Sequence, residues 1–187
     1  LSKPLPERHF RTNLSGMGQA GAPIESGDQC YGERRTGARG PYDTYYYCLN
    51  RPRQVPGLTD VVEVSAGGRN TCVRKRDQTV WCWGYNGAPY TPDPGQGLVG
   101  DGLPNTELCP SAPWNPPEYT PRGGPCRQRP SRLTGLTGAV SIGVAEDHSC
   151  VLLSSGQIWC WGSRATGTGS ASAVPVLVPW SVMRRDE

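Results

Sequence analysis

The sequence contains one short stretch twice, as Trp81-Cys82-Trp83-Gly84 and as Trp159-Cys160-Trp161-Gly162, 78 residues apart. At the same offset Cys72 matches Cys150. The other cysteines follow: Cys48 matches Cys126, and Cys30 matches Cys109 within one residue. All eight cysteines of the chain therefore fall into two sets of four. Self-similarity at a fixed period is the sequence signature of a solenoid or a propeller, in which each repeat is one supersecondary unit stacked on its neighbours.

Each copy predicts a β-hairpin whose register places two cysteines opposite each other. In the second copy a three-residue loop, 154–156, puts Gly156 at the left-handed position that such hairpins need. In the first copy Gln78 occupies that position, so we expect slight backbone strain there. Directly opposite residues have Cα atoms about 4.5 or 5.5 Å apart, which a disulfide can span. We therefore predict the cross-strand disulfides Cys72–Cys82 and Cys150–Cys160.

The two tryptophans of each copy are expected to share one strand face. Side chains alternate along a strand, so Trp81 and Trp83 point away from the side of Cys82, and Trp159 and Trp161 repeat this arrangement. A Trp-x-Trp pair can pack between sheets or form a ligand platform. We expect packing, because aromatic side chains dominate protein cores.

The whole pattern resembles the regulator of chromosome condensation repeat. It reads Val/Ile-x-x-Gly-x-x-x-x-Ser-Cys-x-Leu followed by Gly-x-Val/Ile-Trp-Cys-Trp-Gly, here in Ile142–Leu152 with Gly156–Gly162, and in Val64–Val73 with Gln78–Gly84. Ala145 stands where that pattern has its glycine. Other segments are similar to further parts of the repeat: Gly95–Gly102, Gly16–Gly21 and Val174–Val176. The resemblance implies an all-β chain of β-propeller-type blades, since the family's repeats of about 50 residues build a seven-bladed propeller. The Trp-Cys-Trp form with a paired cysteine resembles the bacterial, extracytoplasmic branch.

The chain departs from this resemblance in the length of its units. Each unit has 78 residues because a loop is enlarged, between Asp101 and Arg132 and in the equivalent segment 21–53. Each enlarged loop carries its own cysteine pair, and we predict that Cys30–Cys48 and Cys109–Cys126 staple these loops. Closing a loop of about 18 residues contributes about 3 kcal/mol in the chain-entropy account of disulfides.

Two signatures are too few to close a seven-bladed ring, so the expected fold is a partial propeller of about two full repeats. We expect an N-terminal segment, 1–53, with a degenerate partial repeat and a stapled loop, and a first repeat with a stapled loop at 54–131. The second repeat and the C-terminal strand of a further repeat follow at 132–187. Three interpretations stay open: a fragment of a longer protein, an assembly completed by copies or partners, or a partial propeller capped by its own loops. The absence of a starting Met favours a processed or partial chain, and uncovered blade edges would invite strand pairing.

Composition and charge exclude several other classes. The 25 Gly and 19 Pro among 187 residues, with only 35% hydrophobic residues, argue against helical bundles and Rossmann-like enzymes, which need long periodic runs. Six Trp and eight Tyr argue against disorder. The net charge of +3 is too small for a dedicated nucleic-acid protein. No apolar stretch approaches the roughly 20 residues that span a bilayer.

The sequence indicates neither an enzyme nor a cofactor or metal site. His148 and Ser149 are neighbours, and in a strand their side chains point to opposite faces, which disfavours a catalytic triad. Two His and no Cys-x-x-Cys pair disfavour zinc, and Asp93 and Asp101 lack the spacing of a calcium loop. There is no phosphate-binding loop, dinucleotide fingerprint or HExxH motif.

The enlarged loops are the candidate partner-binding segments. They are rich in Arg, Tyr and Trp, the residue types that dominate binding hot spots. The alternative, weighted equally, is that these side chains pack each loop onto its own blade. The candidate contact residues are Arg34, Arg35, Tyr45, Tyr46, Tyr47, Trp114, Tyr119 and Arg127.

We expect an extracytoplasmic protein, because an even number of cysteines in a Gly/Pro-rich chain indicates a disulfide framework and an oxidising compartment. A signal peptide would already be removed or lie outside this chain. The predicted function is non-catalytic protein–protein interaction, as a structural subunit of a larger surface or envelope assembly or as a homo-oligomer, without nucleic acid. The alternative function is a secreted propeller-type inhibitor or a ligand- or glycan-binding protein.

Overall fold

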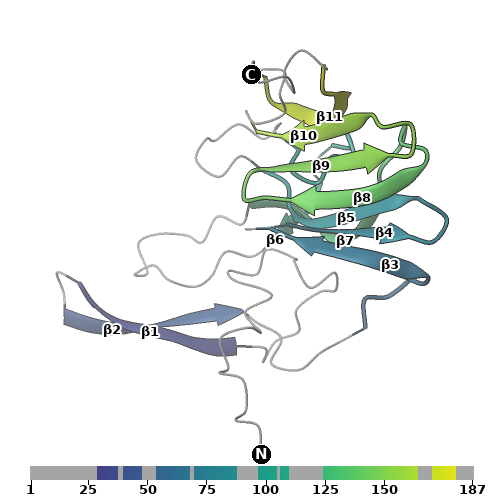
Figure 1. Cartoon of the computed structure of the whole chain (residues 1–187). Helices are drawn as coiled ribbons and strands as arrows, with labels where there is room; N and C mark the ends of the chain where they lie inside the picture. Colours follow the sequence, from purple (N-terminus) through teal and green to yellow (C-terminus); the bar gives the residue numbers. More distant parts are fainter. Residues whose placement is uncertain are drawn as a thin grey trace, which may run out of the picture.

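The chain folds into antiparallel sheets, as a computed structural model shows (Figure 1). The structure describes residues 29–37, 40–47, 54–67, 70–87, 97–104, 106–109, 124–163 and 170–179. Three sheets are present in these ranges, with the strand orders β1-β2, β3-β4-β5-β7-β6 and β11-β10-β9-β8. Their strands are β1 (Gln29–Gly37), β2 (Gly40–Tyr47), β3 (Val61–Ala66), β4 (Asn70–Lys75), β5 (Val80–Tyr85), β6 (Leu108–Cys109), β7 (Gly124–Arg132), β8 (Ala139–Val144), β9 (His148–Leu153), β10 (Ile158–Gly162) and β11 (Ser172–Leu177). The all-β prediction is therefore confirmed.

The four-stranded sheet and the first four strands of the five-stranded sheet have the form of propeller blades. Strands β3, β4, β5 and β7 form blade 1, and strands β8, β9, β10 and β11 form blade 2. In each blade three consecutive strands make a meander, and the fourth strand joins after a longer connection. The fourth strand of blade 1, β7, lies inside the segment expected to be an enlarged loop. The segment 174–176, expected to belong to a further repeat, lies in β11 and completes the sheet of blade 2.

The central hairpin of each blade has the predicted register. Cys72 lies opposite Cys82, and Cys150 lies opposite Cys160. Both pairs form disulfides, with a Cα–Cα distance of 4.1 Å in each, so these two predicted bridges are confirmed. We call Cys72–Cys82 the inner disulfide and Cys150–Cys160 the outer disulfide. Because both hairpins use the same three-residue loop, a left-handed backbone recurs at Gly156 (φ +82°) and at Gln78 (φ +64°).

The two blades stack with unlike faces together. Each blade has a cystine face, which carries its disulfide, and an opposite tryptophan face, which carries its Trp-x-Trp pair. Strand β8 packs against β3 and β4, as Figure 1 shows. The core joins the cystine face of blade 1 to the tryptophan face of blade 2, through Cys72, Val80 and Cys82 on one side and Ile142, Val151 and Trp161 on the other. Packing of these tryptophans between sheets is confirmed for blade 2, where Trp161 is 0% exposed.

Candidate interaction surfaces and the frame that presents them

Two side chains of β3 attach blade 2 to blade 1. The carboxylate of Glu63 accepts hydrogen bonds from the Ile142 amide and the Ser141 hydroxyl, both at 3.1 Å. The Ser65 hydroxyl oxygen accepts a bond from the Val144 amide at 3.0 Å. Strand β8 lies at the edge of its sheet, so the donors on its outer side have no partner strand, and these bonds satisfy them. The same bonds hold β3 and β8 in register.

The Glu63 carboxylate is ionised in this setting. Its other oxygen accepts a bond from Arg74 Nε at 2.8 Å. Burial is the largest single influence and raises the pKa of Glu63. Together, the hydrogen bonds from Arg74, Ile142 and Ser141 and the positive charge of Arg74 lower the pKa by more than burial raises it. The pKa of Glu63 therefore lies below its ordinary value. We therefore expect the Glu63 contact between the blades to weaken when this carboxylate is protonated.

The segment 97–101, which we call the inter-blade loop, lies between the two blades. The carbonyl oxygen of Leu98 accepts bonds from Asn70 Nδ2 of blade 1 at 2.9 Å and from Trp161 Nε1 of blade 2 at 3.1 Å. Gly100 has φ +82°, and a Cβ placed on it would lie 2.5 Å from the Trp161 ring. Only glycine fits here, so the Gly-rich stretch identified in the sequence acts as an inter-blade spacer.

A buried ion pair fixes the end of this loop. Arg127 on β7 donates from Nε to Asp101 Oδ2 at 2.6 Å and from Nη2 to Asp101 Oδ1 at 3.2 Å. The same Nη2 donates to the carbonyl oxygens of Leu103 and Pro104. Arg127 was a candidate contact residue, but it is 7% exposed and its guanidinium bonds within the chain. This geometry matches the alternative interpretation, in which such residues pack the enlarged loop onto its blade.

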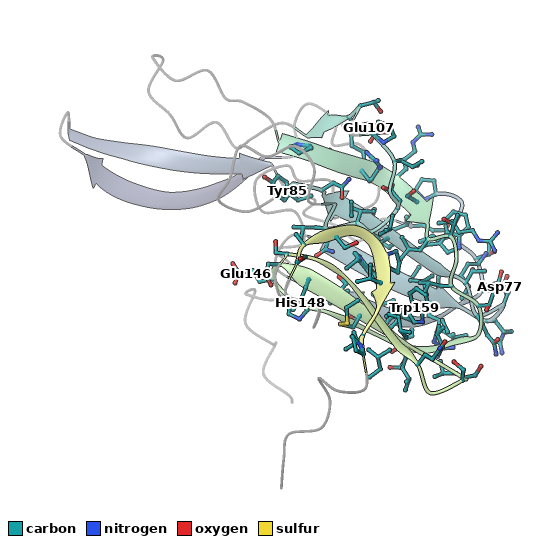
Figure 2. The ribbon with its side chains drawn as sticks, turned by 90° about the horizontal axis from the view of Figure 1, so that it is seen from above. Asp77, Tyr85, Glu107, Glu146, His148 and Trp159 are labelled. Carbon is teal, nitrogen blue, oxygen red and sulfur yellow. A yellow bond between two sulfur atoms is a disulfide. The ribbon has the colours of Figure 1, made fainter. Side chains whose placement is uncertain are left out.

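Several other candidate contact residues lie in a separate hairpin, β1–β2. Its backbone register places Arg34 opposite Asp43, Tyr45 opposite Tyr31, and Tyr46 opposite Cys30, with an irregularity between Tyr31 and Arg34. Arg35 and Tyr47 lie in the same two strands. The cysteine spacing predicted only a stapled loop here. Figures 1 and 2 show the hairpin beside the blades and within neither of them.

The predicted loop staples stay predictions. Cys126 is disulfide-bonded, and Cys109 lies in β6, which pairs with the beginning of β7. Cys48, Trp114 and Tyr119 lie outside the described residues. Nothing in the described ranges therefore tests Cys30–Cys48 or the proposed contacts of the second enlarged loop.

Near the turn between β8 and β9, the titratable side chains of Asp147 and His148 contact each other. His148 Nδ1 lies 2.9 Å from Asp147 Oδ1, at a partly exposed position, and Figure 2 shows His148 and Glu146 at the end of the blades opposite Asp77. Ser149, in contrast, is buried and accepts a long bond from Asn70 Nδ2 at 3.4 Å.

Within the described ranges no group of three or more His, Cys, Asp and Glu side chains could hold a metal ion. Among the same residues no helix is long and apolar enough to cross a membrane.

Comparisons with known proteins agree with this geometry. Residues 61–88 and 139–164 each match the sequence profile of the Regulator of chromosome condensation (RCC1) repeat. Two similar solved structures are yeast RCC1 (Prp20) bound to Kap60 and Prp20p from Saccharomyces cerevisiae, with TM-scores of 0.51 for both. They are 17% and 18% identical to this chain and cover 89% of it.

The matched structures are much longer than this chain, which covers 32% and 33% of them. Among curated proteins, none matches the chain significantly in sequence. The likeness to the solved structures concerns the fold, while the profile matches fall on β3–β5 and β8–β10, the strands that carry the two disulfides. The chain thus carries two segments that match the regulator of chromosome condensation repeat, folded as stacked propeller-type blades.

Proposed function

We propose that this chain is a non-catalytic module for protein–protein interaction that works outside the cytoplasm as a structural subunit of a larger assembly. The observation that carries the proposal is a structural difference: the two blades pack on each other as a rigid frame, whereas the hairpin β1–β2 is part of neither blade. The blades are built around a shared core and a buried loop. The Arg- and Tyr-rich hairpin β1–β2 belongs to neither blade. A rigid frame that presents such segments is typical of binding proteins.

The solved relatives support protein partners rather than a substrate. One is yeast RCC1 (Prp20) bound to Kap60, and the other is Prp20p, whose structure is described with its binding properties to Gsp1p and histones. Charge supports the same choice for this chain. Two arginines of the blades, Arg74 and Arg127, are already paired with Glu63 and Asp101, so neither supplies an unpaired positive charge for a nucleic acid.

The disulfides support an extracytoplasmic location. The inner disulfide is fully buried in the core between the blades. When the blades are stacked, this site must hold either the formed disulfide or two tightly packed thiols. Disulfides of this kind persist in secreted, periplasmic and surface proteins and are rare in the cytosol. Thiol labelling of the chain as isolated from its native source, without reductant, should find no reactive cysteine. Labelling of several cysteines would contradict this location.

The partner experiment compares native, non-reducing mass spectrometry of the wild-type chain with two matched variants. One variant removes two hairpin arginines, Arg34→Ala with Arg35→Ala. The control removes two exposed arginines of β7, Arg129→Ala with Arg132→Ala. We expect a stoichiometric complex with other chains that the hairpin variant loses and the control keeps. A chain isolated without any other subunit, or a complex that both variants keep, would refute the proposal. A 1:1 complex with a soluble enzyme would instead favour an inhibitor.

A further inference from the structure

The second enlarged loop leaves blade 1 and rejoins it through two segments that contact each other. We call residues 101–104 with 106–109 the outgoing arm and residues 124–128 the returning arm. Residues 110–123, between the two arms, lie outside the described ranges. The ends of the arms pair as the short ladder β6–β7, with Leu108 opposite Pro125 and Cys109 opposite Gly124. The base of the loop is therefore part of the sheet that contains blade 1.

One side chain of the returning arm holds three residues of the outgoing arm. Arg127 donates from Nε and Nη2 to the Asp101 carboxylate, at 2.6 Å and 3.2 Å. Its Nη2 also donates to the carbonyl oxygens of Leu103 at 2.8 Å and Pro104 at 3.1 Å. Asp101 Oδ1 accepts a further bond from the Leu103 amide at 3.1 Å. Because the Arg127 and Asp101 side chains are almost completely buried, water competes little with these charge-assisted bonds.

One residue of the outgoing arm holds the returning arm in exchange. The carbonyl oxygen of Glu107 accepts a bond from the Cys126 amide at 3.1 Å. The carboxylate of Glu107 accepts a bond from the Gln128 amide at 2.9 Å. Both donors belong to β7, so Glu107 satisfies two of its amides beside the short strand β6.

The same arms are tied to the body of blade 1. In β7, Cys126 lies opposite Tyr85 of β5. The carbonyl oxygen of Pro125 accepts a bond from the Asn86 amide at 2.8 Å. Asn86 Oδ1 in turn accepts a bond from the Val99 amide of the inter-blade loop, also at 2.8 Å. Cys126 and Asn86 are 0% and 1% exposed, so the base of the loop is continuous with the buried interior of the blade.

We propose that the contacts of Arg127 and Glu107, which we call the loop clamp, hold both arms on blade 1 by themselves, whatever sequence occupies residues 110–123. Every contact given above joins two residues outside that segment. The blade then keeps its fold when the segment changes in sequence or length, so the loop can be specialised for a partner at little cost to stability. This inference goes beyond the proposed function and does not depend on it, because it concerns unfolding of the chain alone.

The test replaces residues 110–123 by a Gly/Ser linker of the same length and, in a second variant, by a linker of twice that length. Both variants keep the loop clamp and all eight cysteines. Urea unfolding of the oxidised chains, followed by tryptophan fluorescence, gives the folding equilibrium constants. We expect both variants to fold, and doubling the linker should lower the constant only about threefold, the entropy of doubling a flexible loop. A linker variant that does not fold, or a larger fall on doubling, would overturn the proposal.

A double-mutant cycle asks whether residues 110–123 support the loop clamp. Asp101→Asn should lower the folding equilibrium constant on the order of 100-fold. The factor should agree within about threefold between the wild-type chain and the equal-length linker variant, because effects at independent sites add in free energy. The matched control for coupling is Asp101→Asn with Arg127→Met, whose effects should not add, since these residues contact each other. A larger disagreement between the two backgrounds would show that the segment supports the clamp, and the proposal would be wrong.

Discussion

Replacing Asp101 by Asn should destabilise the chain strongly. The side chains of Asp101 and Arg127 are only 1% and 8% exposed, so the amide would leave a buried guanidinium without its counter-charge. Removing one partner of a buried ion pair typically costs about 3–5 kcal/mol. Arg127 keeps its bonds to the Leu103 and Pro104 carbonyl oxygens, so we expect the lower end of that range, about 3 kcal/mol. Such a loss is a large share of the stability of an ordinary domain.

The assay is urea unfolding of the oxidised chain, followed by tryptophan fluorescence. Arg74→Met is the matched control, because the Glu63–Arg74 pair is 26% and 21% exposed and should contribute under about 1 kcal/mol. The double variant Asp101→Asn/Arg127→Met should be more stable than Asp101→Asn alone, since it no longer buries an unpaired charge. A cost of Asp101→Asn similar to that of Arg74→Met would refute the reasoning, and so would a double variant that is less stable than Asp101→Asn.

Three further predictions concern the contact between the blades. The folded-state pKa of Glu63 lies below its ordinary value of 4.5, so its stabilisation is complete above that value and is lost as the pH falls through the folded-state pKa. Glu63→Gln should therefore flatten the fall in unfolding free energy between about pH 5 and pH 3, and parallel wild-type and variant curves would contradict this. Gly100→Ala should cost about 1–3 kcal/mol more than Gly156→Ala in urea unfolding. Both positions have φ +82°, but only at Gly100 would the new Cβ meet the Trp161 ring; equal costs would show that the ring moves aside freely. Brief reduction and alkylation, read by mass spectrometry, should open the outer disulfide before the inner one, because blade 2 covers the inner one completely; simultaneous opening would contradict the stacking.

The interior of each repeat could be predicted because its determinants are local. The loop length of the hairpin and the alternation of side chains place Cys72 opposite Cys82 and Cys150 opposite Cys160, whatever the rest of the chain does. The same local rule required a left-handed residue at Gln78, and the structure has one there. Because the hairpin recurs 78 residues later, it could be identified as part of a repeat. The resemblance to known repeats then predicted that each repeat forms a propeller blade.

The structure of the enlarged segments could not be predicted in this way. The segment 29–47 was expected to be a loop, but it contains the hairpin β1–β2. The role of Arg127 was also missed, since neither Asp101 nor Arg127 recurs at the repeat offset, where Pro23 and Leu49 stand. A contact made once by residues 26 positions apart leaves no periodic signal.

The sequence by itself determined the repeat, its hairpins, the two cross-strand disulfides and the face on which each tryptophan lies. These features depend on chain segments of about a dozen residues, in which backbone geometry leaves few choices. Only the tertiary structure decided that the cystine face of blade 1 packs against the tryptophan face of blade 2. Hydrogen bonds of Glu63, Ser65 and the inter-blade loop hold this contact. That outcome depends on which surfaces meet when the whole chain folds, and burial of apolar area is non-directional, so no short stretch of sequence encodes it.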